Sequence, residues 1–193
     1  CTVGGGGHTR QFLERVKPGG RVIGLDVDSI ELPRTEASLR ASGFGPDAVV
    51  LHHSNFAGLP RVLAADGVTS VDVIFADLGV SSMQLDNPDR GFSYKQTGPL
   101  DMRMNPARGE PASALIARLD ATALAEILST NADEPFADLI AGRLMQLRPA
   151  TTQDSARAVR DVLTKTQPRL SPDEITLSLR RTFQALRIEV NAE

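Results

Sequence analysis

The sequence of 193 residues has one cysteine, one tyrosine and no tryptophan, and it contains no long apolar run. A single cysteine, Cys1, cannot form a disulfide within the chain, which fits a reducing compartment. No apolar run approaches the roughly 20 residues of a membrane-spanning helix, and no segment is typical of a signal peptide. These absences predict a cytoplasmic protein without a membrane partner, built as one sizeable domain or one domain with a small insertion.

Charge is unevenly distributed along the chain. The net charge of −3 argues against a strongly cationic nucleic-acid-binding protein. Residues 1–142 contain 12 basic and 18 acidic residues, whereas residues 143–193 contain 9 basic and 6 acidic residues. The basic surplus at the end is either a solvated helical face or a binding surface for a polyanion.

The first 80 residues alternate between segments typical of strands and segments typical of helices. Short apolar runs predict strands at 21–28, 48–53 and 71–79, and the opening "CTV" is typical of the end of another strand. Helices are expected between them. Alternation of this kind predicts an α/β fold with a doubly wound parallel sheet. Because the chain starts without Met inside a strand, we expect it to be a fragment lacking both termini.

From residue 111 onward the signals are helical. Asp120 and Asp133 are predicted N-caps. A helix is expected at 155–165. Another is expected from Ser171, where Glu174 three residues later predicts a capping box.

The glycine stretch "TVGGGGHT" joins a strand to a helix, where glycine lets the backbone approach a ligand closely. It lacks the lysine of a P-loop, and Thr9 stands where a dinucleotide-binding turn has its third glycine. Asp26 ends the next strand, where an acid accepts hydrogen bonds from ribose hydroxyls. The pattern predicts a nucleoside-containing ligand without a pyrophosphate, for which S-adenosyl-L-methionine is the obvious candidate. The alternative is a tight turn followed by a helix cap.

The histidines do not predict a metal site. His8 is expected to line the glycine turn. His52 and His53 are adjacent, so that they face opposite sides of a strand, and no cysteine or acid completes a metal-binding spacing around them.

Asp77 ends the predicted strand 71–79, where open α/β sheets place their chemistry, and Gln84 follows in the next loop. A functional role is favoured for Asp77 over a role as helix cap.

The segment "RGFSYKQTGPLDMRMN" at 90–105 has neither helical nor strand periodicity, although it combines charges, aromatics and methionines. One interpretation is a loop that binds RNA, with an aromatic ring stacking on a base and cations meeting phosphates. The alternative is a structured Ω-loop braced by ion pairs with Asp89 or Asp101, in which Met102 and Met104 serve packing. The candidates for RNA contact are Arg90, Phe92, Tyr94, Lys95 and Arg103.

Six motifs occur together along the chain: "GGGGHT", "DVD", "DLGVSSMQLD", "RGFSY", "GPLDMRM" and "RRTFQALRIEVN". In this order they closely resemble the RsmH/MraW family, bacterial methyltransferases that modify the N4 amine of a cytosine in the decoding region of 16S ribosomal RNA. The resemblance implies a class I S-adenosylmethionine methyltransferase, a Rossmann-like doubly wound sheet with an inserted all-helical domain. It also implies the small ribosomal subunit as partner, and no DNA.

The resemblance implies domain bounds as well. Residues 1–105 would form the methyltransferase core, residues 106–170 the inserted helical domain for substrate recognition, and residues 171–193 a helix returning to the core.

The resemblance further implies roles for single residues. Gly6, Gly7 and His8 would contact the methionine end of the cofactor, and Asp26 would hold the ribose. The residues that would complete the pocket are Phe56 against the adenine, Asp77 and Gln84. A core role is equally open for Phe56.

Asp77 is also the candidate catalytic residue. The exocyclic amine of cytosine is a poor nucleophile, and a carboxylate accepting its proton would direct the lone pair toward the methyl group. The rival role of Asp77 is cofactor binding alone. Two other functions stay open: a methyltransferase of the same fold acting on another substrate, and a non-catalytic RNA-binding or ribosome-assembly module.

Overall fold

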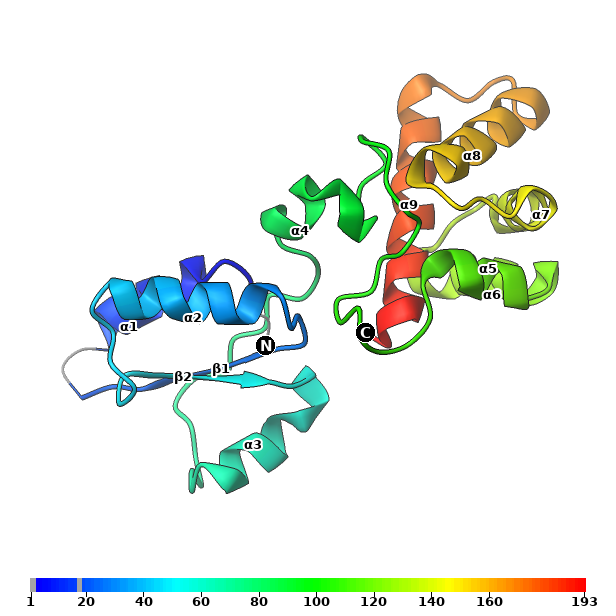
Figure 1. Cartoon of the computed structure of the whole chain (residues 1–193). Helices are drawn as coiled ribbons and strands as arrows, with labels where there is room; N and C mark the ends of the chain where they lie inside the picture. Colours follow the sequence, from blue (N-terminus) through cyan, green and yellow to red (C-terminus); the bar gives the residue numbers. More distant parts are fainter. Residues whose placement is uncertain (1–2, 17–18) are drawn as a thin grey trace. The chain divides into compact units, whose positions relative to one another are not determined.

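The computed structural model describes residues 3–16 and 19–193 and divides the chain into two compact units, Cys1–Met83 and Gln84–Glu193 (Figure 1). Cys1 and Thr2, which open the expected first strand, lie outside the described residues. Val3 is described, and it is buried but belongs to no strand.

The first unit is a small three-layer α/β structure. Its elements are α1 (Gly7–Arg15), β1 (Val22–Asp26), α2 (Glu31–Ala41), β2 (Val49–His53), the 3-10 turn η1 (Phe56–Gly58) and α3 (Leu59–Ala65). The two strands pair in parallel, from Val22 opposite Val49 to Asp26 opposite His53. Helices α1 and α2 cover one face of this pair and α3 lies on the other (Figure 1). The parallel α/β arrangement predicted for this part of the chain is confirmed.

The core on the α1–α2 side of this unit contains residues from both helices, from β2 and from the loop between α2 and β2. Leu13 of α1, Leu39 of α2, Phe44 and Val49 of β2 form a buried cluster. Burying an aliphatic or aromatic side chain of this size contributes about 1.5–3 kcal/mol. The cluster therefore fixes α1 and α2 on the sheet, and with them the turn that precedes α1.

The predicted strand at 71–79 is wrong for this structure. Among the described residues only β1 and β2 form a sheet, and the side chains of Val73 and Ile74 are 76% and 65% exposed. A strand exists through hydrogen bonds to a neighbouring strand, so apolar, β-branched residues do not form one without a partner edge. This segment belongs to no helix or strand and has a row of exposed apolar side chains.

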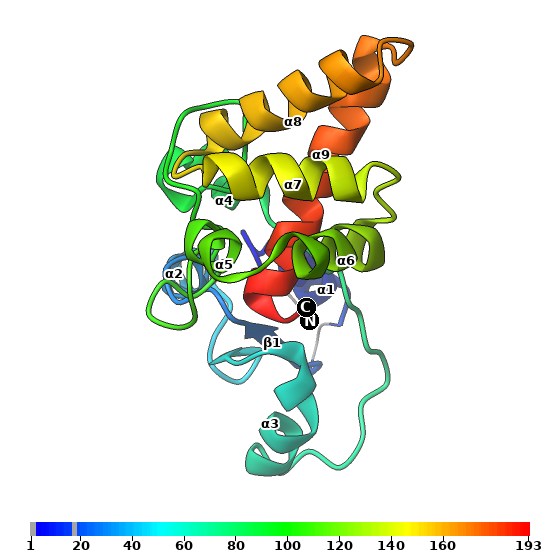
Figure 2. The same cartoon turned by 90° about the vertical axis from the view of Figure 1, so that its right-hand side faces the viewer.

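The second unit is helical. The elements are α4 (Ser82–Asp86), which begins just before it, then the 3-10 turn η2 (Pro88–Arg90), α5 (Ala112–Arg118), α6 (Ala121–Ala132), α7 (Ala137–Leu147), α8 (Thr152–Thr166) and α9 (Pro172–Asn191). Helices α6, α7 and α8 lie side by side, and α9 crosses them (Figure 2). The buried face of α9, centred on Leu179, Phe183 and Leu186, closes the core of this unit.

Of the three helix caps predicted from the sequence in this unit, two are present and one is not. Asp120 caps α6 by accepting from the backbone N–H of Ala123 at 2.8 Å, and Ser171 with Glu174 forms the expected capping box of α9. Both predictions are confirmed. The prediction for Asp133 is wrong, because Asp133 ends α6 in the left-handed conformation with φ 48°. Aspartate tolerates that conformation better than most residues, and it reverses the chain before α7.

The predicted domain bounds remain a prediction. The division at Met83 and Gln84 groups the 90–105 loop with the helices, and α9 packs on α6 and α8. In the part of the chain that the structure describes, no helix has the length and apolar character needed to cross a membrane.

Candidate functional site

The glycine turn is anchored by the carboxylate of Asp26. Oδ2 of Asp26 accepts from the backbone N–H groups of Val3 and Gly4, both at 2.9 Å, and Oδ1 accepts from the N–H of Asp28 at 2.8 Å. The side chain lies at the end of β1 and the residue is 6% exposed. Hydrogen bonds from three N–H groups fix the orientation of this carboxyl group. Asp26 therefore joins the glycine turn to the end of β1.

The turn itself is tightly packed on one side and open on the other. Gly4 and Gly6 have φ of 50° and 77°, which a side chain would strain. A Cβ at Gly6 would come within 2.8 Å of Cγ2 of Thr35, whereas a Cβ at Gly7 would meet nothing within 4 Å. Thr35 of α2 also donates its hydroxyl to the carbonyl of Gly4. Glycine is thus required where the turn touches α2, and the backbone at Gly7 is accessible to a ligand.

The helix cap that the sequence offered as the alternative role for Asp26 is made by Asp28, two residues after it. Oδ1 of Asp28 accepts from the N–H groups of Ile30 and Glu31 at 2.9 and 3.0 Å, at the start of α2. The two acids therefore have separate roles. A carboxylate offers about four acceptor positions. Among the described residues, backbone N–H groups take three of them at Asp26, which leaves one for a further donor.

His8 and Asp77 meet beside this turn. Nδ1 of His8 lies 3.4 Å from Oδ2 of Asp77, and the two side chains are 59% and 60% exposed. The ring of Phe75 lies 5.1 Å from that of His8 and 5.2 Å from that of Phe12 on α1. The structure therefore brings together two of the predicted site residues at the glycine turn.

The other predicted residues are placed differently. Phe56 begins η1 and is half-buried. Gln84 is 5% exposed and belongs to the second unit, so its part in a cofactor pocket stays a prediction. His52 contacts Asp66 at 2.9 Å and His53 contacts the carbonyl of Val27 at 2.9 Å. No group of three metal-ligating side chains occurs in residues 3–16 and 19–193.

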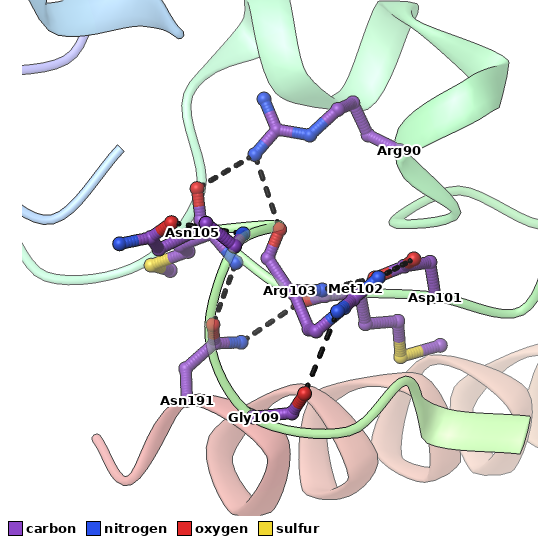
Figure 3. A network of polar contacts seen from close by, with 9 residues as sticks. Arg90, Asp101, Met102, Arg103, Asn105, Gly109 and Asn191 are labelled. Carbon is purple, nitrogen blue, oxygen red and sulfur yellow. Dashed lines mark hydrogen bonds and ion pairs between the residues drawn. The ribbon is translucent and has the colours of Figure 1, made fainter. Parts of the chain in front are cut away.

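In the second unit, polar contacts hold the 90–105 loop in a defined shape (Figure 3). Nη2 of Arg90 donates to the carbonyls of Arg103 and Met104 at 3.1 and 2.9 Å. Arg103 pairs with Asp101 through two hydrogen bonds of 2.8 Å. Burial raises the pKa of Asp101, but the hydrogen bonds and charge of Arg103, with the charge of Arg90, outweigh burial and leave that pKa below its usual value. The ion-pair brace expected for this loop is confirmed.

Asn191, the last residue of the motif "RRTFQALRIEVN" but given no role by the sequence, closes the loop onto the end of α9. Its side-chain amide donates to the carbonyl of Met102 at 2.8 Å and accepts from the N–H of Met104 at 2.7 Å (Figure 3). Met102 has φ of 64° although it is not glycine. No local signal could identify Asn191, since its partners lie 87 and 89 positions earlier.

Burial separates the candidates for RNA contact. Met102 and Met104 are 0% and 4% exposed, which confirms their packing role, and Phe92 is 6% exposed. Arg90 is buried too, and its guanidinium lies 5.5 Å from the centre of the Phe92 ring. Tyr94 is half-buried and Lys95 is exposed. A role of the loop in RNA binding stays a prediction, and these contacts favour Tyr94 and Lys95.

A parallel α/β unit with a glycine turn anchored by the acid that ends the following strand belongs to the Rossmann-like class of α/β proteins. The family model described as the MraW methylase family matches residues 1–193, and the chain belongs to that family. The family implies the class I methyltransferase fold.

Similar curated proteins are named for ribosomal RNA methylation. The chain is 40% identical over 198 residues to ribosomal RNA small subunit methyltransferase H 2 of Alkaliphilus metalliredigens, covering 100% of this chain and 56% of the relative. It is 43% identical over 199 residues to ribosomal RNA small subunit methyltransferase H of Halorhodospira halophila, covering 100% of this chain and 58% of the relative. The chain thus spans a little more than half the length of these relatives.

Proposed function

We propose that the protein containing this chain transfers a methyl group from S-adenosyl-L-methionine to the N4 amine of cytosine 1402 in 16S ribosomal RNA. The observation that carries the proposal is the family match over residues 1–193, together with relatives at about 40% identity whose names state small-subunit ribosomal RNA methylation. The substrate would be the small ribosomal subunit or its RNA, in the cytoplasm.

The first unit contains groups that fit the cofactor. The accessible backbone at Gly7 suits close approach of a ligand, and the remaining acceptor position of Asp26 suits a ribose hydroxyl. Gly6, Gly7 and His8 would hold the methionine end, Asp26 the ribose and Phe56 the adenine, with Gln84 completing the pocket. When bound, the cofactor supplies the electrophilic methyl group.

Asp77 would act on the nucleophile. Its carboxylate is 60% exposed beside the glycine turn, so an incoming amine can reach it. By accepting a hydrogen bond from the cytosine amine, Asp77 would withdraw the amine lone pair from the ring and take up the proton that transfer releases. His8, 3.4 Å away, would orient this carboxylate. Holding amine and methyl group in line can contribute several orders of magnitude in rate.

The test uses the complete protein and small ribosomal subunits that lack the modification. After incubation with the cofactor, mass spectrometry of the 16S RNA should show one additional methyl group, on N4 of cytosine 1402. A methyl group on another base would point to the same fold with another substrate. Tight RNA binding without methyl transfer would point to a non-catalytic module. Either result would overturn the proposal.

A further inference from the structure

Tyr94 lies in the 90–105 loop between helices α8 and α9. Its ring packs edge-on against Phe183 of α9, with centroids 5.3 Å apart, and its carbonyl accepts from Nε2 of Gln153 of α8 at 2.9 Å. Two residues after Tyr94, the carbonyl of Gln96 accepts from the hydroxyl of Thr152 of α8 at 2.8 Å. Tyr94 is therefore a fixed, half-buried aromatic residue and not a mobile loop side chain.

Arg160 of α8 places its guanidinium 5.9 Å from the centre of the Tyr94 ring. Gln153, Arg157 and Arg160 are spaced by four and three residues, so they lie on one face of α8, the face that contacts Tyr94. Arg160 is exposed although it contacts the ring. A planar cation next to an aromatic ring is the arrangement on which unpaired bases stack.

Further cations occur close to this pair along the loop and along α9. Lys95 follows Tyr94 directly, and Arg180 lies one helical turn before Phe183 on α9; both are exposed. Within the described parts of the chain, neither Lys95, Arg160 nor Arg180 has a carboxylate within 4.0 Å, and Arg157 contacts Asp154 only at 3.4 Å with both side chains at least half exposed. Cations without acid partners around an aromatic ring complement a phosphate backbone.

We propose that Tyr94 and Arg160, with Lys95, Arg157 and Arg180 around them, form a docking surface for single-stranded RNA on the helical unit. An unpaired base stacks on the guanidinium of Arg160 and the exposed part of the Tyr94 ring, and the basic side chains contact the flanking phosphates. The proposal rests on the proposed function and adds α8 and α9 to the expected RNA-binding loop. It adds Arg157, Arg160 and Arg180 to Tyr94 and Lys95, the two loop residues already expected to contact RNA.

The test measures binding of the complete protein to a fluorescently labelled single-stranded RNA oligonucleotide and to a duplex of the same length. Arg160→Ala should weaken single-strand binding about 10-fold, because base stacking on such a platform contributes on that order. Arg160→Lys keeps the charge and loses the plane, so it should recover only part of this affinity. Lys95→Ala and Arg180→Ala should each reduce the slope of log affinity against log salt by about 0.7. Arg118→Ala, which removes the same charge from α5, is the matched control.

Tyr94 provides an independent readout. Tyr94→Phe keeps the ring and its contact with Phe183 and should bind as the wild type does, whereas Tyr94→Leu should bind about 10-fold more weakly. Wild-type affinity in both Arg160 variants, or equal losses in Arg160→Ala and Arg118→Ala, would overturn the proposal. Preference for the duplex would overturn it as well. If the wild type methylates subunits while these variants bind RNA normally, only the docking surface is wrong. If RNA binding depends on Arg160 and no methyl is transferred, only the proposed activity is wrong.

Discussion

The side-chain amide oxygen of Asn191 accepts a hydrogen bond of 2.7 Å from the backbone N–H of Met104, across 87 positions of sequence. The same amide donates to the carbonyl of Met102, on the other side of Arg103. One side chain at the end of α9 thus satisfies the backbone of a segment that belongs to no helix or strand. The shape of the 90–105 loop depends on α9 being in place.

Replacing Asn191 by alanine should therefore loosen the loop. Unpaired backbone groups in a half-buried position cost about 1–3 kcal/mol, so Asn191→Ala should speed amide hydrogen exchange in peptides that span 98–109. Asn131→Ala is the matched control, since that amide makes only contacts of 3.4 Å. Equal exchange in the two variants would show that Asn191 does not hold the loop.

Two glycines should respond in opposite ways to alanine. A Cβ at Gly98 would lie 1.9 Å from the carbonyl oxygen of Pro88, and a Cβ at Gly142 on α7 would meet nothing within 4 Å. Gly98→Ala should lower the thermal midpoint, because backbone has to move. Gly142→Ala should raise stability by about 0.5–1 kcal/mol, because alanine favours a helix interior. Calorimetry that shows the same sign for both would contradict this description of the loop.

Acid should weaken the brace between Asp101 and Arg103. The pKa of Asp101 is lowered in the folded protein from its ordinary 3.8, so its stabilising contribution is present above that value and is lost as pH falls below it through the folded pKa. Asp101→Asn should thus be less stable than the wild type at neutral pH, and the difference should shrink under acid conditions. Thermal midpoints measured against pH test this. Glu126→Gln, which removes one exposed carboxylate from α6, is the control for the loss of a single negative charge.

Substitutions of Asp77 and Asp26 should separate an effect on methyl transfer from an effect on cofactor binding. Asp26→Asn should weaken S-adenosyl-L-methionine binding, since a charge-assisted hydrogen bond is worth about 1.5–3 kcal/mol. Asp77→Asn should lower kcat for methyl transfer with little change in cofactor affinity. Calorimetric titration and single-turnover transfer on the complete protein measure the two effects. A loss of cofactor affinity in Asp77→Asn equal to its loss of rate would assign Asp77 to cofactor binding alone.

Sequence patterns predicted correctly the features that neighbouring residues determine or mark. The caps at Asp120 and Ser171 depend on residues three positions away, and the glycine turn and the two strands are marked by their own residue types, although the contacts that hold them come from further along the chain. The sequence predicted His8 and Asp77 as separate site residues and did not predict their contact at 3.4 Å.

The errors come from interactions between distant residues. The segment 71–79 has strand-forming residues, but no local pattern reveals whether a partner edge is present. Asp133 suits either end of a helix, and the packing of α7 beyond it decides between them. Phe92 looked suitable for stacking on a base, and its burial beside Arg90 is visible only in three dimensions.

The apolar side chains at 71–78 are exposed, so the first unit gains no hydrophobic free energy from burying them. Val73, Ile74 and Leu78 keep more than half of their accessible surface in water, and each Å² of apolar surface removed from water contributes about 25 cal/mol. Any surface that covers the row therefore stabilises the first unit in proportion to the area it buries. Until then, detergents and apolar dyes, which bind bare hydrocarbon, should associate with this stretch before any other in the unit.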